Sequence, residues 1–160
     1  MLCVTQSSHF SLPFAKAYEL VRHAPLMVKS SGAPVIHYQA PLGIWDGAPV
    51  HYRMLQGMVV FAWSGFVTHC SAASFRVKIA PAHKGPFTDF TAAHQFEEDG
   101  QSCVVVHDQF DVNASDPQFE QTFSQASCYY GFEGRSWAAL SETERQTTLL
   151  STLPQSNAAG

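Results

Sequence analysis

The chain has 160 residues, of which 46% are hydrophobic and only 14% are charged, and its formal net charge is −4. This length suits one well-packed domain and is too short for two ordinary ones. The negative charge and the absence of a basic run argue against a nucleic-acid-binding protein and against binding to anionic membranes. We expect one domain over residues 1–146 and a loose tail over residues 147–160, which is rich in Ser, Thr, Gln and Ala.

The sequence also gives expectations about location and cofactors. The first residues lack the basic start and apolar run of a signal peptide, and no stretch approaches the roughly 20 apolar residues that span a bilayer. We therefore expect a cytoplasmic protein with no integral membrane contact. Its expected oligomeric state is a monomer or a homodimer. No cofactor or metal is expected, because the chain has no phosphate loop, dinucleotide fingerprint, nucleophile elbow or closely spaced His pair. The four cysteines are too far apart for a zinc or disulfide framework and are expected to be free thiols: Cys3, Cys70, Cys103 and Cys128.

The first half of the chain predicts a strand, a helix and then more strands. A strand is expected over residues 4–12, and Pro13 then opens a helix over residues 14–23. Residues 34–47 alternate poorly and contain turn residues, so no strand is assigned there. Further strands are expected over residues 50–55, 59–70 and 74–79.

Residues 85–112 carry the clearest pattern, which is that of two long strands joined by a tight turn. Side chains on a strand alternate between its two faces. The residues predicted to share one face are Phe90, Ala92, His94 and Phe96 on the first strand and Val104, Val106, Asp108, Phe110 and Val112 on the second. One His and one Asp thus lie on an otherwise apolar face, which is either a core with an internal polar pair or the wall of a cavity.

The turn fixes which of these residues lie opposite one another. Asp99-Gly100-Gln101 can form a three-residue loop, with Gly100 in the left-handed conformation. Such a loop places His94 opposite Val106 and leaves Asp108 diagonal to His94, at a distance where the two can still pair.

The C-terminal part predicts a long helix. Asp116 is a good N-cap and Pro117 a good first helical residue. Apolar residues then recur at helical spacing at Phe119, Phe123, Ala126 and Tyr130. The order of strand, helix, antiparallel strands and long helix indicates an α+β protein.

Two groups of residues resemble the START/Bet v 1-like superfamily, also called SRPBCC or polyketide cyclase/dehydrase-like. The first is the turn Gly85-Pro86-Phe87 with the alternating Phe90, His94 and Phe96 and the inward Asp108. The second lies upstream, at residues 47–53, Gly57, Trp63 and Phe66. The chain departs from the pattern at Phe90, Ala92 and Val112, where Trp, His and Tyr are common, and its loop over residues 80–84 is long.

The resemblance covers roughly residues 9–140, and over this range the chain is similar to the ligand-binding branch of the superfamily. It implies a helix-grip fold, in which a curved antiparallel sheet wraps around a long C-terminal helix with an internal cavity. The stripe of Phe119, Phe123 and Tyr130 would then face the strand residues Phe90, His94 and Phe110. Ordinary core packing explains the same stripe equally well.

The candidate site residues are the polar and aromatic side chains expected near that cavity. They are Tyr52, Arg53, Trp63, Phe90, His94, Asp108, Phe110, Phe119, Phe123 and Tyr130. Tyr52 and Arg53 are strand neighbours and must point to opposite faces, but the sequence leaves open which of them points inward.

Three function classes remain open. The preferred one is a carrier or sensor of a small hydrophobic ligand such as a lipid, isoprenoid quinone or aromatic metabolite. The alternative is a cyclase, dehydratase or aromatase in which His94 and Asp108 serve as acid–base groups. The third is a protein-interaction domain whose cavity has closed. For His94 and Asp108 themselves, a structural hydrogen-bonded pair is the favoured interpretation over a catalytic one.

Overall fold

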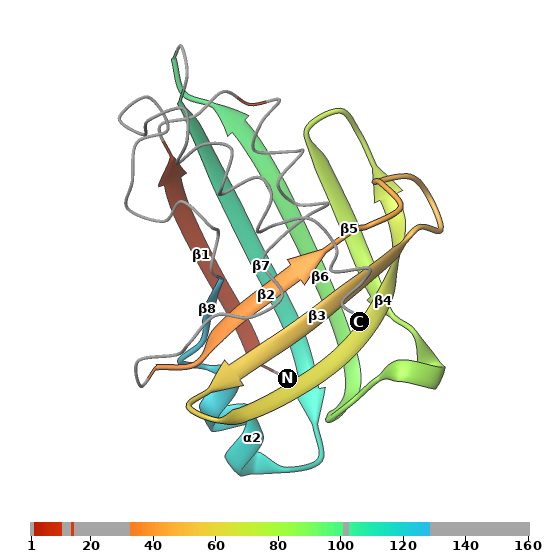
Figure 1. Cartoon of the computed structure of the whole chain (residues 1–160), viewed down its shortest axis with the longest axis vertical. Helices are drawn as coiled ribbons and strands as arrows, with labels where there is room; N and C mark the ends of the chain where they lie inside the picture. The colour runs from red at the N-terminus through yellow and green to blue at the C-terminus, as the bar shows by residue number, and fades with distance from the viewer. Residues whose placement is uncertain (1, 11–13, 15–32, 101–102, 129–160) are drawn as a thin grey trace, which may run out of the picture.

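One eight-stranded sheet organises the part of the chain that the computed structural model describes, namely residues 2–10, 14, 33–100 and 103–128. Its strand order is β1-β7-β6-β5-β4-β3-β2-β8 (Figure 1). The strands are β1 (Leu2–Phe10), β2 (Val35–Gln39), β3 (Pro49–Gln56), β4 (Val59–Cys70), β5 (Ser74–Ile79), β6 (Phe87–Glu98), β7 (Val104–Ala114) and β8 (Ser127–Cys128). Neighbours pair antiparallel, except that β2 and β8 are parallel.

The sheet has an inner face, which carries the core, and an outer face. On β6 the inner residues Phe90, Ala92, His94 and Phe96 are buried, whereas the residues between them are more exposed. This alternation is what a half-buried antiparallel strand requires. The predicted strand faces are therefore confirmed, and the observed ends of β4 and β5 coincide with the predicted ones.

Strand β2 was missed by the sequence analysis. Its central residues Ile36, His37 and Tyr38 are all buried, so the period of two that marks a half-exposed strand is absent. The strand is nevertheless fixed in register by β3, because Tyr38 lies opposite Tyr52 and His37 lies opposite Arg53.

The register of the β6–β7 hairpin differs from the predicted one by two residues. Glu98 pairs with Val104, so the connection runs over residues 99–103 and is closed by a hydrogen bond from the Asp99 amide to the Cys103 carbonyl, with an N to O distance of 3.1 Å. Gly100 has the expected left-handed φ, of 79°. Because side chains alternate with period two, a shift of two residues keeps every side chain on its predicted face. It brings His94 directly opposite Asp108 instead of diagonal to it.

The helix that begins at Asp116 is shorter than predicted. The Asp116 carboxylate accepts a hydrogen bond from the Gln118 amide and Pro117 is the first helical residue, as expected, but helix α2 spans only Pro117–Phe123. The chain then turns, and the Ser127 amide donates to the Pro34 carbonyl at 3.2 Å as β8 joins the edge of the sheet. Continuous helix through Ala126 is therefore wrong, because the edge of β2 supplies the backbone partners at this point. Tyr130 and the rest of the predicted long helix lie outside the described residues, as does most of the helix predicted over residues 14–23.

Helix α2 packs its aromatic side chains onto the inner face. Phe119 and Phe123 are its buried residues, and Phe123 contacts Phe87 and Phe110 with ring centroids 5.4 and 5.8 Å apart. Within the described segments, neither α2 nor any other helix combines the length and apolar character needed to cross a membrane.

A side-chain amide joins the two edges of the sheet. Gln6 on β1 accepts a hydrogen bond from the Cys128 amide of β8 at 2.8 Å, and its Nε2 donates to the Cys128 carbonyl at 3.3 Å. These bonds imitate a backbone ladder and bring β1 beside β8 in the curved sheet (Figure 1).

Gly65 on β4 gives a test of how closely the strands pack. A Cβ atom there would lie 2.5 Å from Val77 Cγ1 and 2.6 Å from the Lys78 carbonyl oxygen. Gly65→Ala should therefore lower the free energy of unfolding by about 2–3 kcal/mol, as overpacking does. Gly100→Ala meets open space and should cost only about 1 kcal/mol, through its left-handed backbone. Urea unfolding of both variants checks this order, and a harmless Gly65→Ala would contradict the described strand packing.

Candidate functional site

A chain of three hydrogen-bonded side chains crosses the inner face of the sheet. The Tyr52 hydroxyl lies 3.0 Å from His94 Nε2, and His94 Nδ1 lies 2.7 Å from Asp108 Oδ1. The three residues come from β3, β6 and β7, and each is at most 2% exposed. The predicted pair of His94 and Asp108 is thus present, and Tyr52 extends it.

The chemistry of the three groups indicates the direction of the hydrogen bonds. A carboxylate only accepts, so Asp108 accepts a hydrogen bond from His94 Nδ1–H. Burial, and then the nearby Cys128 and Asp108, raise the pKa of Tyr52 well above its usual value, so the phenol keeps its proton. The Tyr52 O–H can therefore donate to Nε2 of a neutral imidazole. In this arrangement both ring nitrogens of His94 are satisfied from within the protein.

Aromatic rings enclose the imidazole of His94. Tyr38 stacks on it with ring centroids 4.1 Å apart and an interplanar angle of 18°, and Phe75 lies 4.9 Å away. Neither residue was among the sequence-based candidates. Tyr38 could not be found because β2 was not predicted, whereas Phe75 lies on a correctly predicted strand and could have been assigned to the inner face by its alternation.

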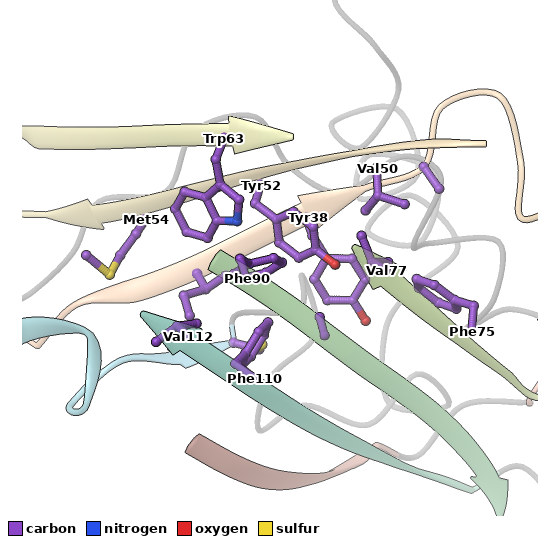
Figure 2. Packing of buried hydrophobic residues seen from close by; sticks show 14 of the residues in the cluster. Tyr38, Val50, Tyr52, Met54, Trp63, Phe75, Val77, Phe90, Phe110 and Val112 are labelled. Carbon is purple, nitrogen blue, oxygen red and sulfur yellow. The ribbon is translucent and has the colours of Figure 1, made fainter. Parts of the chain in front are cut away.

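Trp63 contributes a buried hydrogen-bond donor, its indole N–H, to the inner face. Its ring is parallel to that of Tyr52, with centroids 5.6 Å apart and an interplanar angle of 1°, and it makes edge contacts with Phe87 and Phe90. Figure 2 shows Trp63, Tyr52 and Phe90 on the same side of the sheet. Trp63 is 3% exposed, and its Nε1–H has no hydrogen-bond partner in the part of the chain that the structure describes. Since nearly all buried donors are paired, this atom requires an explanation.

The structure brings most of the predicted site residues together. Phe90 and Phe110 flank the Tyr52–His94–Asp108 chain, and Phe119 and Phe123 approach from α2. Tyr130 lies outside the described residues. The question left open by the sequence is resolved, because Tyr52 points inward and Arg53 therefore lies on the outer face, opposite His37 and Ala62.

His37 is a buried histidine on the outer face of the sheet. It is 3% exposed, and burial, together with the positive charge of Arg53, lowers its pKa from 6.5 to about 4. His37 was not among the sequence-based candidates. Its burial depends on tertiary packing, for which the sequence carries no local signal.

The donor atoms needed for a metal site are not gathered anywhere in the described part of the chain. No group of three or more His, Cys, Asp or Glu residues there is arranged to hold an ion. No disulfide joins the four cysteines, and Cys128 is the buried one.

Comparison with known proteins adds to this geometry. No protein-family model and no curated protein matches the sequence. The solved structures that match at a TM-score of 0.50 include a START superfamily protein from Mycobacterium smegmatis, the di-domain ARO/CYC protein BexL of the BE-7585A biosynthetic pathway, and major latex-like protein 151 from Panax ginseng. Their sequence identities are 8%, 13% and 10%, over 76%, 95% and 94% of this chain. The matches cover 86%, 45% and 91% of those chains, so this chain spans about half of BexL.

The chain has a START/Bet v 1-like fold. At these identities the likeness concerns the architecture and does not extend to activity. The START-like sheet places the Tyr52–His94–Asp108 chain on its inner face.

Asp108→Asn tests the importance of the buried chain in this START-like sheet. The Asn oxygen can still accept a hydrogen bond from His94, but the negative charge is lost, so the free energy of unfolding should fall by about 1–3 kcal/mol. Asp111→Asn, on the outer face of the same strand, removes the same charge from a partly exposed position and should change stability by less than about 0.5 kcal/mol. Chemical denaturation measures both, and equal losses would argue against a special role for Asp108.

The lowered pKa of His37 predicts acid sensitivity. Between pH 6.5 and about 4 the unfolded chain binds a proton at this position that the folded chain does not, so stability falls as the pH drops through this window. The loss attributable to His37 should be on the order of 2–3 kcal/mol. His37→Gln should remove that part of the pH dependence, whereas His69→Gln, at the exposed end of β4, should keep it. Unfolding experiments across this pH range would contradict the assignment if both variants behaved alike.

Proposed function

We propose that this protein binds a small hydrophobic ligand that carries an oxygen function, on the inner face of its sheet. The observation that carries this proposal is the buried indole N–H of Trp63, which has no partner among the described residues and lies in a wall of aromatic rings. An unpaired buried donor costs about 1–3 kcal/mol. A carbonyl, ether or hydroxyl oxygen of a bound ligand would remove that cost.

The polar chain supports binding in preference to catalysis. Both nitrogens of His94 are already engaged, one by Tyr52 and one by Asp108, so the imidazole has no free position at which to exchange a proton with a ligand. The oxygen of Tyr52 keeps a lone pair that can accept a hydrogen bond from a ligand hydroxyl. Tyr52 and Trp63 together thus offer one acceptor and one donor within apolar surroundings, and the buried aromatic surface would supply most of the affinity.

Acid–base catalysis by a cyclase or aromatase is the second candidate, and it rests on the same three residues. A Tyr–His–Asp chain can pass a proton from the phenol to the imidazole while the carboxylate stabilises the imidazolium. If the protein is such an enzyme, Asp108→Asn and His94→Gln should retain ligand affinity and lower turnover by about a hundredfold or more. A carrier shows no turnover of its bound ligand in the wild type.

Native mass spectrometry of the purified protein tests the proposal most directly. We expect a co-purifying apolar molecule with at least one oxygen atom, which denaturation releases. A wild-type protein that carries no such molecule and binds no apolar probe would contradict the proposed function.

Trp63→Phe separates the hydrogen bond from the aromatic surface. The substitution keeps a ring beside Tyr52 and removes the N–H, so affinity for 2-naphthol should fall about threefold to tenfold, as for one lost hydrogen bond. Affinity for naphthalene, which has no oxygen, should change by less than about twofold. Fluorescence titration measures both, with Trp45→Phe, an exposed tryptophan, as the control. An equal loss for the two probes would indicate that Trp63 acts through its ring alone.

A further inference from the structure

Three hydrogen-bonded side chains on the outer face of the sheet have no part in the proposed function. The Ser7 hydroxyl on β1 lies 2.8 Å from His107 Nδ1 on β7, and His107 Nε2 lies 3.0 Å from Glu97 Oε2 on β6. Strand pairing brings them together, because Ser7 lies directly opposite His107 and Glu97 lies diagonal to it on the other side. The side chains of His107 and Glu97 are 41% and 59% exposed, so a solute can reach them.

The carboxylate fixes the direction of both hydrogen bonds. Glu97 only accepts, so His107 Nε2–H donates to it. The neutral imidazole then has its lone pair on Nδ1, which accepts the hydrogen bond of the Ser7 hydroxyl. A serine whose proton points at a histidine, with that histidine oriented by a carboxylate, is the arrangement that activates serine as a nucleophile. Either ring nitrogen can act as the base when the other one carries the proton.

A second serine–histidine pair on the same face lacks the carboxylate. His51 Nδ1 lies 2.9 Å from the Ser64 hydroxyl, but no carboxylate of the described residues hydrogen-bonds to His51. Burial, followed by the charges of Arg53 and His83, lowers the pKa of His51 and so opposes the transfer of a proton to it. The pair of Ser64 and His51 is therefore a control, within the same sheet, for the group of Ser7, His107 and Glu97.

A hollow of about 290 Å³ lies beside Ser7 and His107. Rows of outward side chains line it, because antiparallel pairing aligns them across neighbouring strands. One row contains Gln95, His107 and Ser7, and the next contains Arg76, Ala93 and Gln109.

The backbone of the sheet forms the floor of this hollow. Between the two outward rows lies the row of Phe75, His94 and Asp108, which also borders the hollow. The side chains of these three residues stand on the inner face and are almost fully buried, so only their backbone can reach the outer side. Ala93 has no more than a methyl group, which leaves space between the longer side chains around it. The hollow and the inner face therefore lie on opposite sides of the same strands.

Side-chain amides flank the histidine at the edge of the hollow. Gln95 lies opposite His107, and Gln109 follows it on the same face of β7. Gln109 Nε2 donates one hydrogen to Asp111 Oδ2 at 3.1 Å, which leaves its second N–H for another acceptor. Amide donors placed here can stabilise an oxygen that becomes negative when a nucleophile attacks a carbonyl group.

Arg76 lies on the wall of the hollow that is far from Ser7. It is exposed, and it forms no ion pair with the described residues. Three strand spacings separate β1 from β5, so the Cα atoms of Ser7 and Arg76 are roughly 15 Å apart. A guanidinium suits a carboxylate or another oxyanion. The hollow therefore fits an ester that reacts at Ser7 and carries an anionic group on the side of Arg76.

We propose that Ser7 is the nucleophile of a hydrolase for small carboxylic esters with an anionic group, with His107 as general base and Glu97 as the residue that positions the imidazole. The Ser7 oxygen bonds to the ester carbonyl carbon while its proton passes to His107 Nδ1. The bond from that carbon to the alcohol oxygen then breaks, and the alcohol leaves with the proton. Water attacks the acylated Ser7 by the same route, which releases the carboxylic acid and restores the hydroxyl. This activity does not depend on the ligand proposed for the inner face.

Two chromogenic esters test the proposal. One is 3-acetoxy-4-nitrobenzoate, and the other, 2-nitrophenyl acetate, is the same ester without the carboxylate. For the first ester, kcat of the wild type should exceed the first-order rate in buffer by at least about a hundredfold, which a positioned base can supply. Ser7→Ala and His107→Gln should each abolish this acceleration, whereas Ser64→Ala should keep it.

The kinetic constants separate the roles of Glu97 and Arg76. Glu97→Gln can still accept from His107 but no longer stabilises an imidazolium, so kcat should fall about threefold to tenfold with KM unchanged. Arg76→Gln should raise KM for 3-acetoxy-4-nitrobenzoate about threefold to tenfold and change KM for 2-nitrophenyl acetate by less than about twofold. An equal change for both esters would overturn the assignment of the anionic group, and a wild-type kcat in Glu97→Gln would overturn the role of Glu97.

A fluorophosphonate, which stays on the serine that it modifies, locates the nucleophile. Peptide mass spectrometry should find the label on Ser7 and not on Ser64. Equal labelling of the two serines, or no label on Ser7, would overturn the proposal. A wild type no faster than buffer would do the same, as would a Ser7→Ala protein that keeps the wild-type rate. Ser7 lies on the exposed side of β1, so this variant should fold, and His107→Gln gives the same test if it does not.

Discussion

The buried hydrogen-bonded chain of Tyr52, His94 and Asp108 is the constraint on which the inner face of this protein depends. Three polar groups have been moved out of water into an aromatic environment, and each can stay there because the next one satisfies it. This fixes β3, β6 and β7 relative to one another, since a shift of one residue in any of them would leave a polar group unpaired. These three residues also position two neighbouring rings, because Tyr38 stacks on His94 and Trp63 stacks on Tyr52.

The two faces of the sheet carry different chemistry because alternate residues of the same strands build them. On β3, Tyr52 enters the aromatic interior, while His51 and Arg53 on either side of it line a polar hollow. On β4, Trp63 lies inside, and Ser64 and Ala62 lie outside. The inner face is apolar with few hydrogen-bonding atoms, whereas the outer side chains at this point are mostly polar. One START-like sheet therefore separates aromatic from polar side chains across its two faces.

The sequence predicted what local periodicity determines and failed where tertiary contacts decide. The faces of β6 and β7, the ends of β4 and β5 and the cap at Asp116 all followed from alternation or from local hydrogen bonding. Strand β2 was missed because its centre is buried on both sides. The hairpin register was wrong by two residues because both loop lengths put the same residues inside, so the hydrophobic pattern could not tell them apart. Helix α2 ends earlier than predicted because residues 127–128 pair with the edge of β2, which is distant in sequence.

The bonds between Gln6 and Cys128 join positions 122 residues apart, and this has a consequence for the order of events in folding. Hairpins such as β3–β4 and β6–β7 can form as soon as their own residues have left the ribosome, because their contacts are local. Strand β1, although made first, cannot pair with β7 until most of the chain exists, and β8 comes later still. Contacts of such separation form slowly because a long loop must close before they stabilise anything. During synthesis β1 therefore has an unpaired backbone edge until β7 has been made. Its outward Thr, Ser and His side chains make the exposed strand polar during this time.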